Sequence, residues 1–416
     1  MHKLTDHVAF KDAKLAARYA RGRIPMATLY EAYFDGDLDI VGDINEFIER
    51  RSELVSYRIE RRHLEWLVTH FLPEALLHTQ RQDTRIVREH YDRGNDFFEW
   101  FLGPRMVYTS AYFRDPSESV EQAQDNKLQR VCDKLQLKPG ERLLDIGCGW
   151  GTLARYAAQH YGVDATGVTI SERQAEYGNA QIAKAGLSDR ARILCKDYRG
   201  ISRTQRFDKI VSLEMVEHVG VKNLRSFFEL VRDLCEDSGL FVLQWTGLRR
   251  GFRPEDLIWI MFMGKYIFPG ADASLCPSAM LKPMEKVGWE LHSAENVSIH
   301  YSWTIRRWHE HWLSNRASVI SKYGERWFRI WHMFLAWSAS IATQGNAACF
   351  QLVLNKNLDG YDRTRWVRRA AAARQLLVEL APHEERQAAL LEPRREARPV
   401  LGDGWVGDRG PLSSHV

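Results

Sequence analysis

The chain has 416 residues, of which 45% are hydrophobic and 27% charged, as is ordinary for a globular protein. This length leaves room for two domains or for one large domain with insertions. A formal net charge of +4 is too small to indicate a nucleic-acid partner, and six scattered cysteines without a CxxC pair favour a reduced, intracellular protein over a cysteine-bound metal site.

The N-terminal segment has neither the apolar core of a signal peptide nor the acid-poor composition of a transit peptide. Further along, no stretch approaches the roughly 20 uninterrupted apolar residues that a membrane span needs. Apolar residues recur at helical spacing in INEFIERRSELVSYRIERRHLEWLVTHFL, so residues 1–118 are predicted to form a mostly helical region. We therefore expect a cytoplasmic protein that does not cross a membrane.

Residues 119–357 differ from this region, because short apolar runs alternate there with helical patterns. Such alternation is typical of an α/β fold with a mostly parallel, doubly wound sheet. The predicted strands are RLLDIG (142–147), DATGVTI (164–170), ARILCKD (191–197), FDKIVSLE (207–214), GLFVLQWTG (239–247), WELHSAENV (289–297) and CFQLVLNKN (349–357).

The sheet pattern is interrupted at residues 248–287, which are rich in aromatic residues, arginine and methionine. This composition suits an insertion that covers something apolar. A long helical pattern over 302–337 precedes the last strand. The tail, 358–416, is rich in arginine and alanine and then in glycine and proline, which predicts one helix followed by disorder.

The segment LLDIGCGWG places Asp145 near the end of the first strand and Gly147, Gly149 and Gly151 in the turn that follows. Glycines let the backbone approach a ligand closely and leave N–H groups available at a helix N-terminus. Dinucleotide sites and plain strand–helix turns look similar. The G-x-G-x-G spacing after an acid, with no P-loop lysine, favours S-adenosylmethionine, whose carboxylate and ammonium groups need backbone and acid rather than a pyrophosphate cradle.

Polar residues also follow the next two strands, at the same predicted edge. The second strand would normally end in an acid that binds ribose, but here it ends in GVTIS, so Thr169 and then Gln174 are the candidates for the ribose hydroxyls. After the third strand, Asp197 is placed to accept from the adenine amino group, and Tyr198 to stack on the ring. These strand ends predict one contiguous cofactor site.

Several motifs in one order resemble the cyclopropane fatty acid synthase / mycolic acid methyltransferase family over residues 85–357. They are HYDRGNDFFEWFLGPRMVYTSAYF (90–113), LLDIGCGWG, GVTISERQ, EMVEHVG and KYIFPG. A closer resemblance, to the fungal-type sphingolipid C-9 methyltransferases, rests on HYDRGNDFFEWFLGPRMVYTS, LEMVEHVGV, GKYIFPGADAS, KYGERWFRIW and FDGDLDIVGDINEFIERR. Relatives of that kind usually carry membrane-spanning segments ahead of the enzyme, and this sequence shows none.

The resemblance implies a class I S-adenosylmethionine-dependent methyltransferase, with the N-terminal helical region and a lipid-covering insertion added to the sheet. Its chemistry is methyl transfer to an isolated carbon–carbon double bond of a lipid chain, which leaves a carbocation that an apolar pocket must keep from water. Loss of a proton from the new methyl closes a cyclopropane, whereas loss from a neighbouring chain carbon gives a methyl-branched alkene. The cofactor contacts that carry over are Tyr108, Thr109, Gly147, Gly149, Thr169, Ile170, Gln174 and Tyr198.

In the cyclopropane-forming members of the family a bicarbonate ion serves as the base. The resemblance implies that a backbone group holds it together with side chains matching Ser110, Glu217, Gln244 and Tyr301. Those members usually have Cys at the first of these positions and His at the third. Because glutamine cannot change its charge near neutral pH, Gln244 is interpreted as part of an altered base-binding shell, as in a methyl-branching enzyme. The alternative is a glutamine that caps exposed backbone at the strand end.

Glu217 and His218 follow the fourth predicted strand, in EHVG. They are either a helix N-terminal acid and a surface histidine or members of the site, and the C-terminal edge of a parallel sheet favours the site. Glu214 is interpreted as a residue that orients its neighbours. No metal is expected, because His309 and His311 lie two residues apart, the wrong spacing for one helical face.

The predicted function is methylation of a lipid-chain double bond, with the ceramide base of a sphingolipid as the first substrate choice. The alternatives are an unsaturated phospholipid acyl chain, giving a cyclopropane or a branched product, a small-molecule N-methyltransferase, and a binding module with a degenerate site. The expected partners are the lipid and an anionic membrane surface, reached peripherally through residues 252–268 and nearby arginines. Arg249, Arg250 and Arg253 form either a solvated face or contacts to lipid headgroups. We expect no nucleic acid, and a second copy of the chain is the remaining candidate partner.

Overall fold

The computed structural model describes residues 4–60, 69, 94–272 and 274–368. The chain divides into a large unit, Met1–Tyr361, and a second unit, Asp362–Val416. Only the first residues of the second unit are described. Residues 365–368 are helical, and the rest of the predicted helix and the disordered end of the tail lie outside the described residues. None of the described helices combines the length and the apolar character that crossing a bilayer requires.

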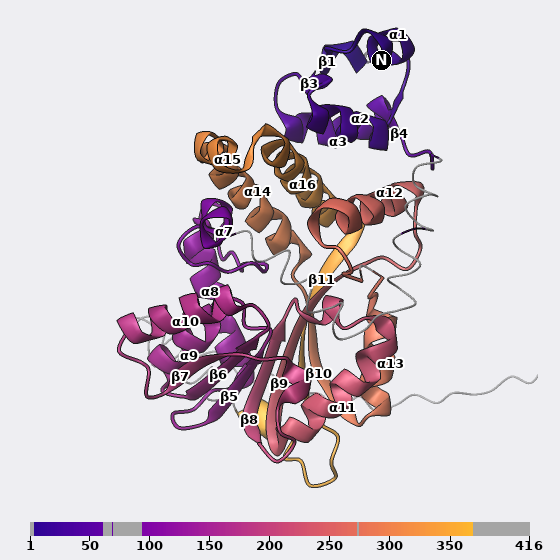
Figure 1. Cartoon of the computed structure of the whole chain (residues 1–416). Coiled ribbons are helices and arrows are strands. Elements are labelled where there is room, and N and C mark those ends of the chain that lie inside the picture. Colours follow the sequence, from indigo (N-terminus) through magenta and orange to yellow (C-terminus); the bar gives the residue numbers. More distant parts are fainter. Residues whose placement is uncertain (1–3, 61–68, 70–93, 273, 369–416) are drawn as a thin grey trace, which may run out of the picture. The chain divides into compact units, whose positions relative to one another are not determined.

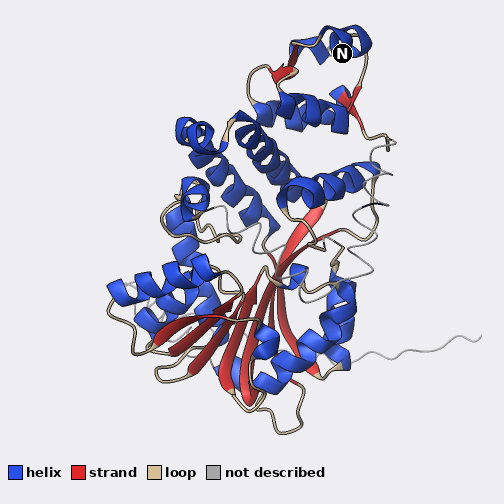
Figure 2. Cartoon of the chain, viewed as in Figure 1, coloured by secondary structure: helices blue, strands red, loops and turns tan. Residues whose placement is uncertain are grey.

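A seven-stranded mixed sheet forms the centre of the large unit, in the order β10-β11-β9-β8-β5-β6-β7 (Figures 1 and 2). Neighbours from β9 to β7 are parallel, whereas β11 is antiparallel to both β9 and β10. All seven predicted strands are confirmed, and with them the doubly wound α/β class. The strands are β5 (Arg142–Ile146), β6 (Asp164–Thr169), β7 (Ala191–Cys195), β8 (Phe207–Leu213), β9 (Cys235–Leu248), β10 (Trp289–Asn296) and β11 (Ala347–Lys356).

Helices cover both faces of the sheet, which explains why β5 and β8 are buried along nearly their whole length. The chain crosses from β5 to β6 and later from β8 to β9, in opposite directions along the sheet. Right-handed crossovers therefore place the helices after β5 and β8 on opposite faces (Figure 1). The covering helices are α8 (Val120–Leu135), α9 (Thr152–Tyr161), α10 (Glu172–Lys184), α11 (Leu224–Leu234) and α13 (Pro277–Lys286).

A second helical layer lies beyond the carboxyl ends of the strands and replaces the single helical pattern predicted over 302–337 (Figure 1). The chain breaks this pattern at Asn315 and again at Gly324, which has a φ of 87° and suits the left-handed region. The first part of the segment 248–287 contributes the rest of the layer, and the chain then continues into α13. The helices are α12 (Pro254–Phe262), a π-helical turn (Met263–Ile267), α14 (Ser298–Ser314), α15 (Arg316–Tyr323) and α16 (Glu325–Thr343).

The N-terminal region contains short strands as well as helices. Two small sheets pair β1 with β3 and β2 with β4. Helices α2 and α3 pack against α16. The elements are β1 (Val8–Phe10), α1 (Ala13–Tyr19), β2 (Ile24–Pro25), α2 (Met26–Asp35), β3 (Leu38–Ile40), α3 (Ile44–Leu54), β4 (Val55–Ser56) and, after the residues that are not described, α7 (Asn95–Leu102).

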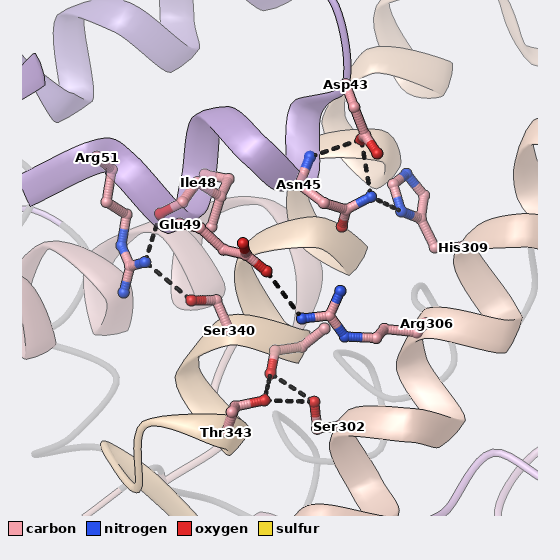
Figure 3. A network of polar contacts seen from close by, with 11 residues as sticks. Asp43, Asn45, Ile48, Glu49, Arg51, Ser302, Arg306, His309, Ser340 and Thr343 are labelled. Atoms are coloured by element: carbon pink, nitrogen blue, oxygen red, sulfur yellow. Dashed lines mark hydrogen bonds and ion pairs between the residues drawn. The ribbon is translucent and has the colours of Figure 1, made fainter. Parts of the chain in front are cut away.

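Arg51 joins the N-terminal region to the second helical layer (Figure 3). Its side chain is 2% exposed, and Nε lies 2.6 Å from the Glu255 carboxylate of α12. The same guanidinium donates to the Ser340 hydroxyl at 2.8 Å and to the Gln344 side chain at 2.7 Å, both at the C-terminal end of α16. One buried cation therefore ties together α3, α12 and α16.

Candidate active site

Two adjoining cavities follow the carboxyl edge of β5, β6, β7 and β8, and every residue predicted to contact the cofactor lines at least one of them. Gly147, Gly149 and Gln174 line both. The first cavity is also lined by Tyr108, Thr109, Lys127, Asp145 and Glu214. The second is also lined by Thr169, Ile170, Asp197, Tyr198, Glu214 and His218.

In the loop after β5, Gly147 and Gly149 are glycine for two different structural reasons. At Gly147, with a φ of 78°, a Cβ would lie 2.4 Å from Cγ of Met215, so this glycine is required by internal packing. At Gly149, with a φ of 53°, a Cβ would meet no atom within 4 Å and would occupy space at the junction of the two cavities. Gly149 therefore keeps open the cradle that S-adenosylmethionine needs at this edge.

Buried charges of both signs line the first cavity. Burial raises the pKa of Asp145 to about 7, and the nearby Lys127 opposes this rise. Burial also lowers the pKa of Lys127 to about 8, and its ammonium donates to the Thr109 hydroxyl at 2.9 Å. Sequence reasoning missed Lys127, although it lies seven residues after the buried Val120 on the inner face of α8, a position normally apolar.

The polar side chains at the ends of β6 and β7 differ in the partners that they already have within the chain. The Thr169 hydroxyl contacts the Gln174 side-chain oxygen at 2.6 Å, which orients the amide of that glutamine. The Asp197 carboxylate forms an ion pair with Arg199 at 2.6 Å, and although burial raises its pKa, the hydrogen bonds from Arg199 lower it overall. The Asp197 carboxylate is therefore already bonded to Arg199 at the site, which the strand pattern alone did not predict.

A third cavity opens from the same edge towards the second helical layer, and its walls are mostly apolar. Helices α12, α14 and α16 all contribute to this lining, and residues between Leu248 and Asp272 supply a further part of it, so the insertion at 248–287 does cover an apolar space. Near the sheet, the Tyr108 ring lies 5.8 Å from Phe268 and 5.5 Å from Trp308, between ring centroids. The apolar lining includes Leu248, Trp259, Ile260, Met263, Phe268, Ile305, Trp308, Phe334 and Ile341.

The polar end of this third cavity is organised around Glu214. Its Oε1 accepts the backbone N–H of Ser110 at 2.9 Å and the side-chain amide of Gln244 at 2.5 Å. The Tyr301 hydroxyl is hydrogen-bonded to the same carboxyl group. Three of the four positions predicted to hold a base therefore contact a carboxylate of the chain itself, which sequence reasoning had treated only as an orienting residue.

Gln244, at the end of β9, is 1% exposed and lines none of the three cavities. While its amide nitrogen donates to Glu214, its side-chain oxygen accepts the Gln351 amide of β11 at 2.8 Å. The side chain thus bonds two other side chains, and the alternative of a strand-end backbone cap is wrong. Ser110 likewise lines none of the three cavities, and its hydroxyl donates to the Ala111 carbonyl at 3.1 Å.

Glu217 lines the third cavity beside Glu214, and His218 lines both the second and third. The Oε1 atom of Glu217 accepts the Thr246 N–H at 2.7 Å, whereas its buried Oε2 has no hydrogen-bond partner among the described residues. Burial and then the charge of Glu214 raise the pKa of Glu217 to about 8. Glu217 is therefore mostly protonated at neutral pH, whereas the hydrogen bonds that Glu214 accepts favour its charged form against the effect of burial.

Comparisons with known proteins agree with this geometry. The family described as mycolic acid cyclopropane synthetase matches residues 78–352. A sphingolipid C9-methyltransferase of Komagataella phaffii is 48% identical over 372 residues, covering 87% of this chain and 76% of the relative. Sphingolipid C9-methyltransferase 2 of Gibberella zeae is 46% identical over 357 residues, covering 85% and 68%. The crystal structure of mycolic acid cyclopropane synthase CmaA1 complexed with SAH and CTAB superposes with a TM-score of 0.63 at 26% identity, covering 66% of this chain and 98% of that one.

Proposed function

The chain belongs to the mycolic acid cyclopropane synthetase family, and from that premise we propose that it is an S-adenosylmethionine-dependent sphingolipid C9-methyltransferase. The sphingolipid assignment rests on the 48% identity to an enzyme of that name. The single structural observation that carries the proposal is the junction at Glu214, where the polar cofactor edge meets an apolar cavity. A lipid double bond has to reach the methyl group at such a junction.

S-adenosylmethionine, when bound, supplies an electrophilic methyl group. Asp145, in the first cavity, would bind its ammonium group, and the open space at Gly149 would allow it close approach to the backbone. Gln174, oriented by Thr169, suits the ribose hydroxyls, and Tyr198 suits the adenine ring. Together these residues would fix the cofactor with its reactive end towards the third cavity.

The third cavity would hold the lipid chain and exclude water from the reacting carbons. Methyl transfer to an isolated double bond leaves a carbocation, and the faces of aromatic rings stabilise nearby cations. The rings of Tyr108, Phe268 and Trp308 lie at the end of the cavity next to the cofactor edge. His218 and Tyr301 border the same space and would shape it around the double bond.

We place the enzyme on a membrane surface, since its substrate is a bilayer lipid. Phe252 and Leu257 are 46% and 38% exposed, and Leu257 lies on α12, the helix whose Trp259 and Ile260 line the apolar cavity. Arg249 is no headgroup ligand, because its guanidinium pairs with Asp256 at 2.9 Å. Sedimentation with liposomes should show binding that weakens on Phe252→Ser and falls with salt, and binding indifferent to both changes would overturn the surface model.

Bicarbonate does not fit this site. The donors that the family resemblance assigns to the ion, the Ser110 N–H and the group at position 244, already bond Glu214. A second anion beside that carboxylate would be repelled by its negative charge. No step of the proposed reaction is therefore assigned to bicarbonate.

The proposal is tested by lipid mass spectrometry of a host that makes Δ8-unsaturated ceramides and expresses the chain. A gain of one CH2 on the sphingoid base is expected, and a gain only on phospholipid acyl chains would contradict the substrate. For the cofactor, Gly149→Val should abolish calorimetric binding of S-adenosylmethionine by filling the cradle. Gly186→Val is the matched control, because Gly186 has a similar left-handed φ of 69° and open surroundings but lines neither cofactor cavity.

A further inference from the structure

We propose that Glu214 is the base of the reaction, a carboxylate built into the chain that removes the proton from the methylated lipid without bicarbonate. The proposal rests on the proposed function, since it presupposes methyl transfer to a double bond. It follows from two independent observations on this residue: its position between the cavities and the donors that hold it.

Glu214 is the only described residue that lines all three cavities. The first two form the cofactor edge and the third is the apolar cavity, so methyl group and double bond meet beside this carboxylate. A base must lie within reach of the carbon that loses the proton. Glu217 lines only the third of these cavities, and Gln244 lines none of them.

The donors around Glu214 hold one carboxylate oxygen firmly. Besides the Ser110 N–H at 2.9 Å and the Gln244 amide at 2.5 Å, the Cys349 thiol contacts Oε1 at 3.7 Å. The peptide N–H of Glu214 donates to the Gln244 carbonyl at 2.8 Å, which fixes the main chain as well. A carboxylate fixed in this way selects which proton it removes, because it cannot move along the lipid chain.

The charges of the cluster suit a base that acts next to a cation. Glu217 keeps its proton at neutral pH, and the donors to Glu214 favour the charged form of that residue. Burial weakens the solvation of the Glu214 carboxylate and raises its pKa, which makes it a stronger proton acceptor than a surface glutamate. The same charge stabilises the carbocation before the proton leaves.

The step balances without any further reactant. The π electrons of the lipid double bond form the new carbon–carbon bond to the methyl group while the methyl–sulfur bond breaks, leaving a neutral thioether and a cation on the lipid. A C–H bond next to the cation then breaks, its electron pair restores the double bond, and the proton moves to Glu214. The resulting carboxylic acid afterwards releases its proton to water.

The backbone at Glu214 makes a sharp experiment available. Its φ is 54°, in the left-handed region that costs a non-glycine residue about 1 kcal/mol or more. Glu214→Gly therefore suits the main chain while removing the carboxylate and leaving its space open. Glu214→Gln keeps the space filled but removes the charge. The two variants separate loss of the base from loss of the fold.

The assay uses the full chain, S-adenosylmethionine and ceramide in vesicles, in buffer freed of carbon dioxide. Wild type should be active and indifferent to added bicarbonate. Glu214→Gln should lose turnover on the order of 10³-fold, with little change in affinity for S-adenosylmethionine, and should not recover with any added acid. Glu214→Gly should show a similar loss of turnover, but millimolar formate or bicarbonate should restore its turnover at least tenfold. The acidic limb of the rescued pH–turnover profile should lie at a different pH for each of the two ions. Glu176→Gln, an exposed acid on α10, is the control and should match wild type.

The outcomes separate the two proposals. Wild-type activity that requires bicarbonate, or a Glu214→Gln variant with more than a tenth of wild-type turnover, overturns the role of Glu214. Methylation of unsaturated phospholipid but not of ceramide overturns the sphingolipid assignment, and the same variants are then compared on the phospholipid product. A folded wild-type chain that methylates no lipid overturns both.

Discussion

Two buried polar clusters in this chain differ in how their central charge is satisfied. Arg51 is surrounded by acceptors and has a carboxylate partner, Glu255, at 2.6 Å. Glu214 is held by an amide, a peptide N–H and a hydroxyl, all neutral, and it borders three cavities. The first cluster lies between helices, and the second lies at the open edge of the sheet.

The difference separates a structural charge from a reactive one. A buried ion whose hydrogen bonds and counter-charge are complete has nothing left to exchange with a ligand, so it fixes neighbouring elements. The donors that hydrogen-bond Glu214 are neutral, and the nearest opposing charge, Lys127, donates instead to Thr109, so the carboxylate is not tied to a cation by a hydrogen bond and stays available to one in the cavity. Substitutions of the same kind should therefore affect stability in one cluster and turnover in the other.

The largest effect on stability is expected at Arg51. Arg51→Met leaves the Glu255 carboxylate without its cation, and removing one partner of a buried ion pair destabilises proteins by about 3–5 kcal/mol. Urea unfolding should show this loss, while the turnover of the remaining folded protein stays close to wild type. Arg50→Met, at the exposed neighbouring position, is the control. A loss below about 1 kcal/mol would show that the pair is not structural.

A matched pair of glutamines tests the comparison more finely. Gln244→Met removes a donor to Glu214 and should lower turnover roughly tenfold or more, since hydrogen bonds to charged groups contribute about 1.5–3 kcal/mol. Loss of that donor also raises the pKa of Glu214, so the acidic limb of the pH–turnover profile should move to higher pH. Gln344→Met, the equivalent change beside Arg51, should leave the profile unmoved. Identical profiles for both variants would contradict the distinction.

The smallest effect on turnover is expected at Glu217. Since its pKa is raised to about 8, Glu217→Gln exchanges one neutral group for another near pH 7 and should change turnover only a few-fold. The raised pKa of Glu217 should instead be detected in the pH dependence of the free energy of unfolding. The raised pKa stabilises the fold fully below about 4.5, and this contribution is lost as pH rises towards 8. Melting temperatures of Glu217→Gln should therefore fall less than those of wild type between pH 5 and 8, and parallel curves would refute the assignment.

Much of the fold and of the cofactor edge was predictable from local sequence. The seven strands were predicted correctly because an apolar run or a helical pattern depends only on residues that are close together in the sequence. The helical pattern over 302–337 is confirmed, but it is divided at Asn315 and Gly324 into three helices, and the break at Asn315 carries no strong local signal. The N-terminal strands were missed for a related reason: two-residue pairings such as Ile24–Pro25 with Val55–Ser56 depend on distant partners.

Sequence by itself determined the sheet, the glycine loop at Gly147 and Gly149, and the apolar insertion, because each depends on periodicity or backbone freedom within a few neighbouring residues. The tertiary structure alone decided which acid carries the charge. Glu214 receives its donors from Ser110, 104 residues earlier, and from Gln244, 30 residues later. Whether a carboxylate is buried, and whether the groups around it favour its charged or its neutral form, depends on residues brought together only by folding. The sequence therefore showed where the acids lie, and the fold surrounded Glu214 with donors that favour its charged form while it left one oxygen of Glu217 without a donor among the described residues.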